Sequence, residues 1–122
     1  YRCSVVVVDY WGTWCPPCRA EVPHFIALQE EYGDRGLQIL GLNYKEDSVS
    51  DVAAFAEENG INYPVGIGNK RAKSAVPEFG GYPTTVFVGR DGTVRLKVTG
   101  AKSKAYLEAV VKALLDEPAP TD

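Results

Sequence analysis

The 122-residue chain has no methionine, a single histidine and only three cysteines. Three cysteines are too few for a disulfide-stapled scaffold, and an odd number leaves one without a partner in the chain. No apolar run approaches the ~20 residues that a membrane-spanning helix requires. A basic excess is also lacking. The formal net charge is −3, which argues against nucleic acid as a partner because phosphate binding requires a basic face.

What remains is the composition of one soluble globular domain. Hydrophobic residues make up 45% of the chain and charged residues 24%, both ordinary values for such a protein. A chain of this length is expected to bury about two thirds of its unfolded surface in one core. We predict that residues 1–117 form the domain and that residues 118–122 form a polar tail. Since the chain starts almost directly with a strand and carries no signal peptide, we also expect an upstream segment that it does not include.

The first third of the sequence predicts a parallel β-α-β unit. Residues 5–11 are an apolar, largely β-branched run that ends at Gly12, as in a buried central strand. A helix over residues 16–32 follows, because proline is tolerated at the first helical positions and apolar residues recur along one face. Residues 37–43 form a second strand. Strand, helix and strand within about forty residues indicate a right-handed crossover.

The rest of the sequence completes a mixed sheet. Ser48 opens a capping-box-like start of a second helix, which Gly60 ends. The Asp91-Gly92 turn between two apolar runs indicates an antiparallel hairpin. The predicted elements are this second helix, a short strand over residues 63–67, a short helix over residues 71–79, hairpin strands over residues 84–88 and 94–98, and a last helix through Leu114 that stops before Pro118. The fold class is therefore α/β.

A Cys-Pro-Pro-Cys stretch lies where the first strand gives way to the first helix, with its cysteines at positions 15 and 18. The amino end of a helix carries partial positive charge and free N–H groups, which stabilise a thiolate and lower its pKa. Cys15 is therefore expected to be the exposed, attacking thiol. Cys18 lies one turn further on and is expected to be the shielded thiol that resolves a mixed disulfide. Pro16 and Pro17 stiffen the loop between the two cysteines.

The same cysteine spacing is also half of a zinc site, which needs a second pair of cysteine or histidine ligands. Only Cys3 and His24 are left to supply that pair, and they do not have its spacing. We therefore predict a redox pair and no metal site. The Cys15–Cys18 disulfide is then the redox group, and no separate cofactor is expected. A zinc-binding structural module stays open as an alternative.

Three stretches resemble a known family. Residues 11–23 (WGTWCPPCRAEVP) resemble the TlpA/ResA-like branch of the thioredoxin superfamily, to which the DsbE-type cytochrome c maturation proteins also belong. Residues 41–47 (GLNYKED) are similar to a segment of the DsbE-type proteins. Residues 81–85 (GYPTT) resemble the cis-proline loop of the whole superfamily. The resemblance covers Val5 to about Leu115 and implies a thioredoxin-like fold, a mixed central sheet flanked by helices in a single domain.

The resemblance also implies a substrate-binding surface around the cysteines. Pro83 would be the cis-proline beside the pair, and the backbone of Tyr82 would offer strand-like hydrogen bonds to a bound partner. Trp14 would be a flat apolar platform next to Cys15. Pro16 and Pro17 would lie at the same surface.

Two carboxylates match family positions. Asp9 matches the buried aspartate of thioredoxins, where ResA-like proteins tend toward asparagine. Glu21 matches the glutamate of the ResA-like branch. Cys18 must lose a proton before it attacks, and a desolvated carboxylate with a raised pKa is a suitable base. Our hypothesis is that Asp9 and Glu21 share this proton transfer.

The resemblance implies a thiol–disulfide oxidoreductase that exchanges with protein thiols and disulfides. It further implies a bacterial reductant outside the cytoplasm, anchored through the upstream segment, with cytochrome c maturation as one pathway. An upstream redox donor, such as a membrane thiol reductase, would restore the dithiol. We expect a monomer.

Two alternatives share the scaffold or the superfamily. A thiol oxidase or isomerase would differ only in redox potential. A peroxidase of the peroxiredoxin class would need a proline-led pattern with a threonine ahead of its cysteine. Residues 9–15 do not supply that pattern.

Overall fold

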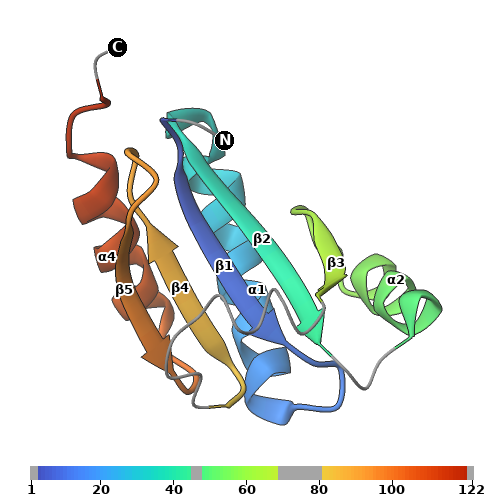
Figure 1. Ribbon diagram of the computed structural model, residues 1–122. Helices are drawn as coiled ribbons and strands as arrows, with labels where there is room; N and C mark the ends of the chain where they lie inside the picture. Colours follow the sequence, from blue (N-terminus) through green and yellow to red (C-terminus); the bar gives the residue numbers. More distant parts are fainter. Residues whose placement is uncertain (1–2, 45–47, 69–80, 121–122) are drawn as a thin grey trace.

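The computed structural model describes residues 3–44, 48–68 and 81–120. Its strands are β1 Val5–Trp11, β2 Leu37–Tyr44, β3 Val65–Gly68, β4 Thr84–Val88 and β5 Val94–Thr99. They form one sheet in the order β3-β2-β1-β4-β5 (Figure 1). β1 pairs in parallel with β2, and β2 in parallel with β3, whereas β4 is antiparallel to β1 and β5 is antiparallel to β4. The predicted mixed sheet is confirmed.

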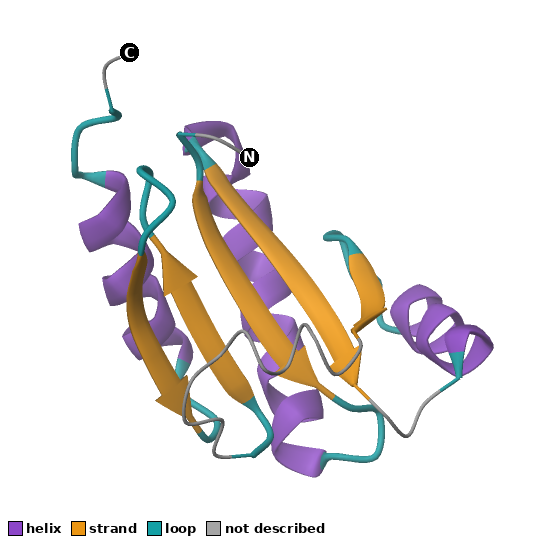
Figure 2. Cartoon of the chain, in the orientation of Figure 1, coloured by secondary structure: helices purple, strands orange, loops and turns teal. Residues whose placement is uncertain are grey.

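The helical elements in the described residues are α1 Pro16–Tyr32, the 3-10 turn η1 Gly33–Arg35, α2 Val49–Glu58 and α4 Lys104–Leu115. α1 and α4 contact each other and cover the same face of the sheet, while α2 lies beside β3 (Figure 2). None of the described helices combines the length and the apolar character needed to cross a membrane. The connection from β1 through α1 to β2 is the parallel crossover that the sequence indicated.

The main core lies between the sheet and the two helices α1 and α4. Successive side chains of a strand point to opposite faces, so Val5 and Val7 enter this core, and Asp9 and Trp11 follow on the same face. Phe87 of β4 is the antiparallel partner of Val7 and is also buried. The helices contribute Phe25, Leu28 and Tyr32 from α1 and Leu107, Val111 and Leu114 from α4. An aspartate therefore continues the core face of the central strand.

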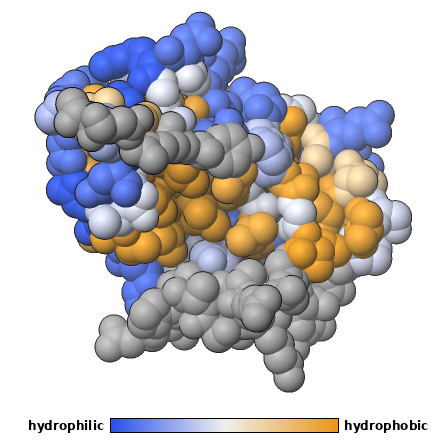
Figure 3. Space-filling model, turned by 45° about the horizontal axis from the view of Figure 1, so that its top comes forward, coloured by the Kyte–Doolittle hydropathy of each residue, from blue (hydrophilic) through white to orange (hydrophobic). Residues whose placement is uncertain are grey.

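The opposite face of the sheet carries a second apolar cluster. Tyr10 and Val86 are its buried members, and Val8, Leu42 and Val88 pack against them. Figure 3 shows apolar side chains gathered across the middle of the molecule's surface. Apolar side chains thus lie on both faces of β1, which accounts for the uninterrupted apolar run at its start.

Local capping and turn interactions stabilise α2 and the hairpin. Ser48 caps α2 by accepting a hydrogen bond from a first-turn N–H at 3.1 Å, and Gly60 follows the helix with a φ of +65°, which suits glycine. Between β4 and β5, Gly92 has a φ of +84°, and Asp91 Oδ1 accepts hydrogen bonds from the N–H and hydroxyl of Thr93. The predicted cap and hairpin are confirmed.

The start of β3 differs from the predicted boundary. β3 begins at Val65 rather than at Tyr63, because Pro64 has no N–H to donate to a neighbouring strand. Its carbonyl still accepts a hydrogen bond from Gly41 N at 2.9 Å. The predicted helix over residues 71–79 lies outside the described residues. The domain boundary before residue 118 stays a prediction.

Candidate active site

Cys15 and Cys18 are joined in a disulfide, with their Cα atoms 5.2 Å apart. Cys15 is the N-cap residue of α1, and its Sγ accepts a hydrogen bond from Cys18 N at 3.3 Å. Pro16 and Pro17 occupy the first two helical positions and are exposed. The described first turn of α1 holds no acidic side chain. After reduction, the positive end of the helix therefore lies against the Cys15 sulfur, with no acidic side chain in the same turn to offset it.

The expectation of an exposed Cys15 is wrong for this disulfide form. Cys15 is 3% exposed and Cys18 is fully buried. Both belong to what we call the active-site cluster, whose other buried members are Trp11 and Val52. The Cys15 sulfur points toward the amino end of α1, and the apolar cluster covers the residue. The expected order of exposure holds, but attack on a substrate requires approach to a nearly buried sulfur.

α2 takes part in the active-site cluster, which sequence reasoning missed. Val52 is a buried member, and Phe55 packs against the cluster with its ring centroid 5.1 Å from that of Trp11. The Arg19 guanidinium lies 5.8 Å above the centroid of the Phe55 ring. The apolar face of α2 was predicted, but the sequence held no signal that this face would meet the cysteines.

The exposed Trp14 and the half-buried Tyr82 form the aromatic surface at the cysteines. Trp14 is 48% exposed, and its ring stands edge-on to Tyr82 with the centroids 5.3 Å apart. Tyr82 also packs against the active-site cluster. A Cβ at Gly12 would clash with the Trp14 indole nitrogen, so a glycine there allows the indole its position. The peptide bond between Tyr82 and Pro83 is cis, as the resemblance implied.

Asp9 and Glu21 are both buried, each with 1% exposure. Glu21 lies one turn after Cys18 on the inner face of α1, and its Oε2 accepts a hydrogen bond from Lys102 N at 2.8 Å. Burial raises the pKa of Glu21 to about 6, and the Lys102 N–H and positive charge oppose this rise. Burial, together with the charge of Glu21, raises the pKa of Asp9 well above its ordinary value. The structure thus brings the two predicted carboxylates together.

Three neighbours of this pair were missed from the sequence. Tyr63 is buried, and its pKa is raised by burial and by the charges of Asp9 and Glu21. Lys102 supplies the N–H to Glu21 from the loop before α4. Thr85 of β4 is the antiparallel partner of Asp9 and is fully buried. Only Thr85 had a signal, since it lies in the GYPTT stretch and in a hairpin strand.

The third cysteine lies at the other end of β1. Cys3 is a free cysteine that precedes the strand, whereas the disulfide follows it. Its carbonyl oxygen accepts a hydrogen bond from Arg90 Nη1 at 2.8 Å. Among the described residues, no three side chains of cysteine, histidine, aspartate or glutamate gather as a metal-binding group.

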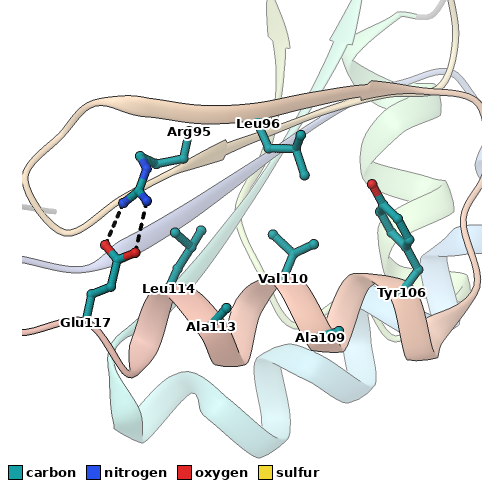
Figure 4. Close-up of a pocket in the computed structure, with 8 residues that line it drawn as sticks. All are labelled: Arg95, Leu96, Tyr106, Ala109, Val110, Ala113, Leu114 and Glu117. Atoms are coloured by element: carbon teal, nitrogen blue, oxygen red, sulfur yellow. Dashed lines mark hydrogen bonds and ion pairs between the residues drawn. The ribbon is translucent and has the colours of Figure 1, made fainter.

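A separate hollow of about 400 Å³ lies between β5 and α4 (Figure 4). Its apolar lining includes Leu96 and Tyr106, and Arg95 and Glu117 pair at one end through two hydrogen bonds of 2.5 and 3.0 Å. None of its lining residues belongs to the active-site cluster or to the predicted site.

Comparisons with known proteins agree with this geometry. The AhpC/TSA family model matches residues 1–97. The chain is 32% identical over 114 residues to the thiol-disulfide oxidoreductase ResA of Geobacillus kaustophilus, covering 93% of this chain and 65% of the relative. It is 34% identical to ResA of Geobacillus thermodenitrificans, with the same coverage of 93% and 65%. The chain thus spans less than two thirds of the length of these relatives.

Solved structures show the same fold. A thioredoxin-family thiol:disulfide interchange protein from Chlorobium tepidum superposes with a TM-score of 0.86 at 28% identity, covering 93% of this chain and 81% of that one. A secreted Mycobacterium tuberculosis disulfide oxidoreductase, homologous to Escherichia coli DsbE, superposes with a TM-score of 0.78 at 25% identity, covering 93% and 84%. The chain therefore belongs to the AhpC/TSA family and is a ResA- and DsbE-like member of the thioredoxin superfamily.

Proposed function

We propose that the protein is a thiol–disulfide oxidoreductase that exchanges electrons with protein substrates through Cys15 and Cys18. The observation that carries this proposal is the disulfide at the amino end of α1, with Cys15 as its N-cap. The cis peptide bond before Pro83 and the exposed Trp14 lie in the parts of the chain that the family uses at its substrate surface. The ResA relatives carry the same activity in their names.

The reaction proceeds in two exchanges. The Cys15 thiolate of the reduced protein attacks one sulfur of a substrate disulfide, forming a mixed disulfide and releasing the other substrate sulfur as a thiolate, which takes up a proton. The Cys18 thiol then loses its proton, and its thiolate attacks the Cys15 sulfur. The Cys15–Cys18 bond forms, the mixed disulfide breaks, and the second substrate thiolate leaves. Two electrons have then passed to the substrate, and an external dithiol must restore the protein.

Asp9 and Glu21 accept the proton of Cys18 in the second exchange. Glu21 follows Cys18 by one turn on the same buried face of α1, and Asp9 lies close enough to sense its charge. Because burial raises both pKa values, each carboxylate is a stronger base than an exposed one. Trp14, Pro16, Pro17 and the half-buried Tyr82 form the surface that receives the substrate, and the buried Pro83 follows Tyr82 through the cis peptide bond.

We further propose that the protein acts as a monomeric reductant outside the cytoplasm, supplied by an upstream donor such as a membrane thiol reductase, with cytochrome c maturation as its pathway. The ResA relatives and the secreted DsbE homologue support this assignment. The reduction potential distinguishes a reductant from an oxidase or isomerase. A potential of about −270 mV is expected, whereas one of about −120 mV would contradict a reductant.

Trapping tests the roles of the two cysteines. A Cys18→Ala variant should hold substrates as mixed disulfides through Cys15, and mass spectrometry of the captured complexes identifies them. The matched control is Cys15→Ala, which leaves Cys18 fully buried and should trap little. Equal trapping by both variants would reverse the assignment of attacking and resolving thiols.

A further inference from the structure

Thr85 lies directly opposite Asp9 in the sheet. The two residues are partners in the antiparallel pairing of β4 with β1, so their side chains lie on the same face. Helix α1 packs on that face, and Glu21, on its buried side, lies near enough for its charge to raise the pKa of Asp9. Thr85 is fully buried and Asp9 is 1% exposed. A hydroxyl and a carboxyl are thus held as cross-strand neighbours in the interior.

The oxygen atoms of this pair are buried without hydrogen-bond partners among the described residues. This holds for Thr85 Oγ1, for both carboxyl oxygens of Asp9 and for Glu21 Oε1. The adjacent threonine behaves differently, because the Thr84 hydroxyl donates to the Gly81 carbonyl in the loop before β4. Buried polar groups are normally paired, and those left unpaired are costly to keep. The Thr85 hydroxyl is therefore available to Asp9 rather than committed to the fold.

Burial and then the charge of Glu21 disfavour the ionised form of Asp9. Glu21 approaches from α1 as a second acid, and Tyr63 from the segment before β3 senses the charges of both carboxyls. The β2 partner, Gly41, contributes no side chain. Lys102 acts on Glu21 through its N–H and its charge, and the two cysteines become titratable after reduction. A neutral hydroxyl on the neighbouring strand is the donor that an Asp9 carboxylate can use without a further buried charge.

We propose that Thr85 is a positioning residue for thiol–disulfide exchange, whose hydroxyl donates a hydrogen bond to the Asp9 carboxylate and so keeps it available as a base for Cys18. This inference rests on the proposed function. In the second exchange, Cys18 passes its proton to the Asp9 carboxylate and attacks the Cys15 sulfur. Asp9 becomes the neutral acid, and the Thr85 hydroxyl keeps its own proton throughout. When Asp9 later returns the proton to solvent, the hydrogen bond forms again.

Carboxyl NMR titration of the purified protein tests the hydrogen bond. Thr85→Val keeps the shape of the side chain but removes the donor, and it should raise the pKa of Asp9 by about one unit, since the ionised form loses a favourable hydrogen bond. Thr85→Ser keeps the donor and should restore a pKa close to the original. Thr99→Val on β5 is the matched control, because this exposed threonine should leave Asp9 unchanged. An unchanged pKa of Asp9 in Thr85→Val overturns the inference.

A second measurement uses the unaltered protein, so it decides the matter even if Thr85→Val does not fold. The methyl resonance of Thr85 should shift with the same midpoint as the Asp9 carboxyl, whereas the methyl of Thr84, whose hydroxyl donates to Gly81, should not. A methyl resonance of Thr85 that does not shift as Asp9 titrates would contradict the proposal.

The rate of mixed-disulfide resolution links the hydrogen bond to the reaction. In Thr85→Val the pH midpoint of this rate should rise by the same amount as the pKa of Asp9, about one unit. Both NMR readouts are independent of substrate, so the two proposals fail separately. If exchange activity is absent but the expected NMR shifts appear, the proposed function fails while the Thr85–Asp9 hydrogen bond stands. Exchange with an unaltered pH profile in Thr85→Val removes the role of Thr85 alone.

Discussion

The two ends of β1 differ in the hydrogen bonding of the polar groups around them. At its start, Arg90 donates hydrogen bonds to the carbonyls of Cys3, Arg35 and Leu115, and thereby ties three segments together. At its end, the carboxyl of Asp9 and the hydroxyl of Thr85 are buried without hydrogen-bond partners in the described chain. Hydrogen bonds from Arg90 join segments at the first end, whereas the Asp9 and Thr85 oxygens at the second end are unpaired, which suits the proton transfer that we propose. We call these the clamped end and the reactive end.

The largest effect is expected at the reactive end. Cys15→Ser should abolish exchange with protein disulfides, because no thiolate then stands at the amino end of α1. The measurement is reduction of a model protein disulfide by the reduced variant. Cys3→Ser is the matched control, since the free Cys3 lies at the clamped end, and it should retain full activity. Loss of activity in Cys3→Ser would show that exchange activity also depends on the clamped end.

Substitutions at the clamped end should lower the free energy of unfolding rather than the exchange activity. Arg90→Ala removes three hydrogen bonds from a charged donor and should lower the free energy of unfolding by roughly 3 kcal/mol, measured by urea denaturation. Arg95→Ala is the matched control, because Arg95 belongs to a partly exposed ion pair with Glu117, and its loss should cost far less stability. The folded Arg90→Ala protein should still exchange at the normal rate. A slowed resolution step there would contradict the separation of the two ends.

Ionisation of Asp9 at the reactive end should lower the free energy of unfolding as the pH rises. A carboxyl whose pKa is raised by folding stabilises the protein least when it is ionised, so the contribution of Asp9 is lost as the pH rises through its folded pKa. Asp9→Asn should therefore be more stable than the unaltered protein at pH 8, by about 1.4 kcal/mol for each unit of the shift, and similar to it near pH 4. It should also resolve mixed disulfides more slowly.

Denaturation curves across this pH range check the effect of Asp9. Asp34→Asn, a change at an exposed carboxyl, serves as the control and should not alter the pH dependence. A difference between Asp9→Asn and the unaltered protein that stays constant with pH would show that burial of Asp9 is not the cause.

The smallest expected effect concerns the aromatic surface. Gly12→Ala places a Cβ against the Trp14 indole and should displace the ring, raising KM for a protein substrate about threefold while kcat changes little. Gly66→Ala is the matched control, since a Cβ there meets no atom within 4 Å. Unchanged steady-state kinetics in Gly12→Ala would remove Trp14 from the substrate surface.

Much of the fold could be predicted because its signals are local. The apolar run of Val5–Trp11, the prolines that open α1 and the Asp91-Gly92 turn each act through neighbouring residues, and all three appear in the structure where expected. The beginning of β3 was misplaced because Pro64 offers a carbonyl but no N–H.

The candidate site was predictable where its residues lie in one stretch. Cys15, Cys18 and Glu21 follow one another along the start of α1; spacing predicted the cysteine pair, and the family resemblance singled out Glu21. The contribution of α2, by contrast, could not be predicted, because Val52 and Phe55 meet the cysteines only after the chain has passed through β2. Cys15 is buried in the same cluster, whose members come from distant segments of the chain.

The sequence by itself determined the reaction type, because a Cys-Pro-Pro-Cys pair at the start of a helix has its chemistry set by local backbone charge. Only the tertiary structure decided the surroundings of that pair. It placed Thr85 opposite Asp9, brought Tyr63 beside the two carboxylates and aimed the Lys102 N–H at Glu21. These contacts join residues far apart in the chain, and they depend on strand register and helix packing, which no single stretch of sequence encodes.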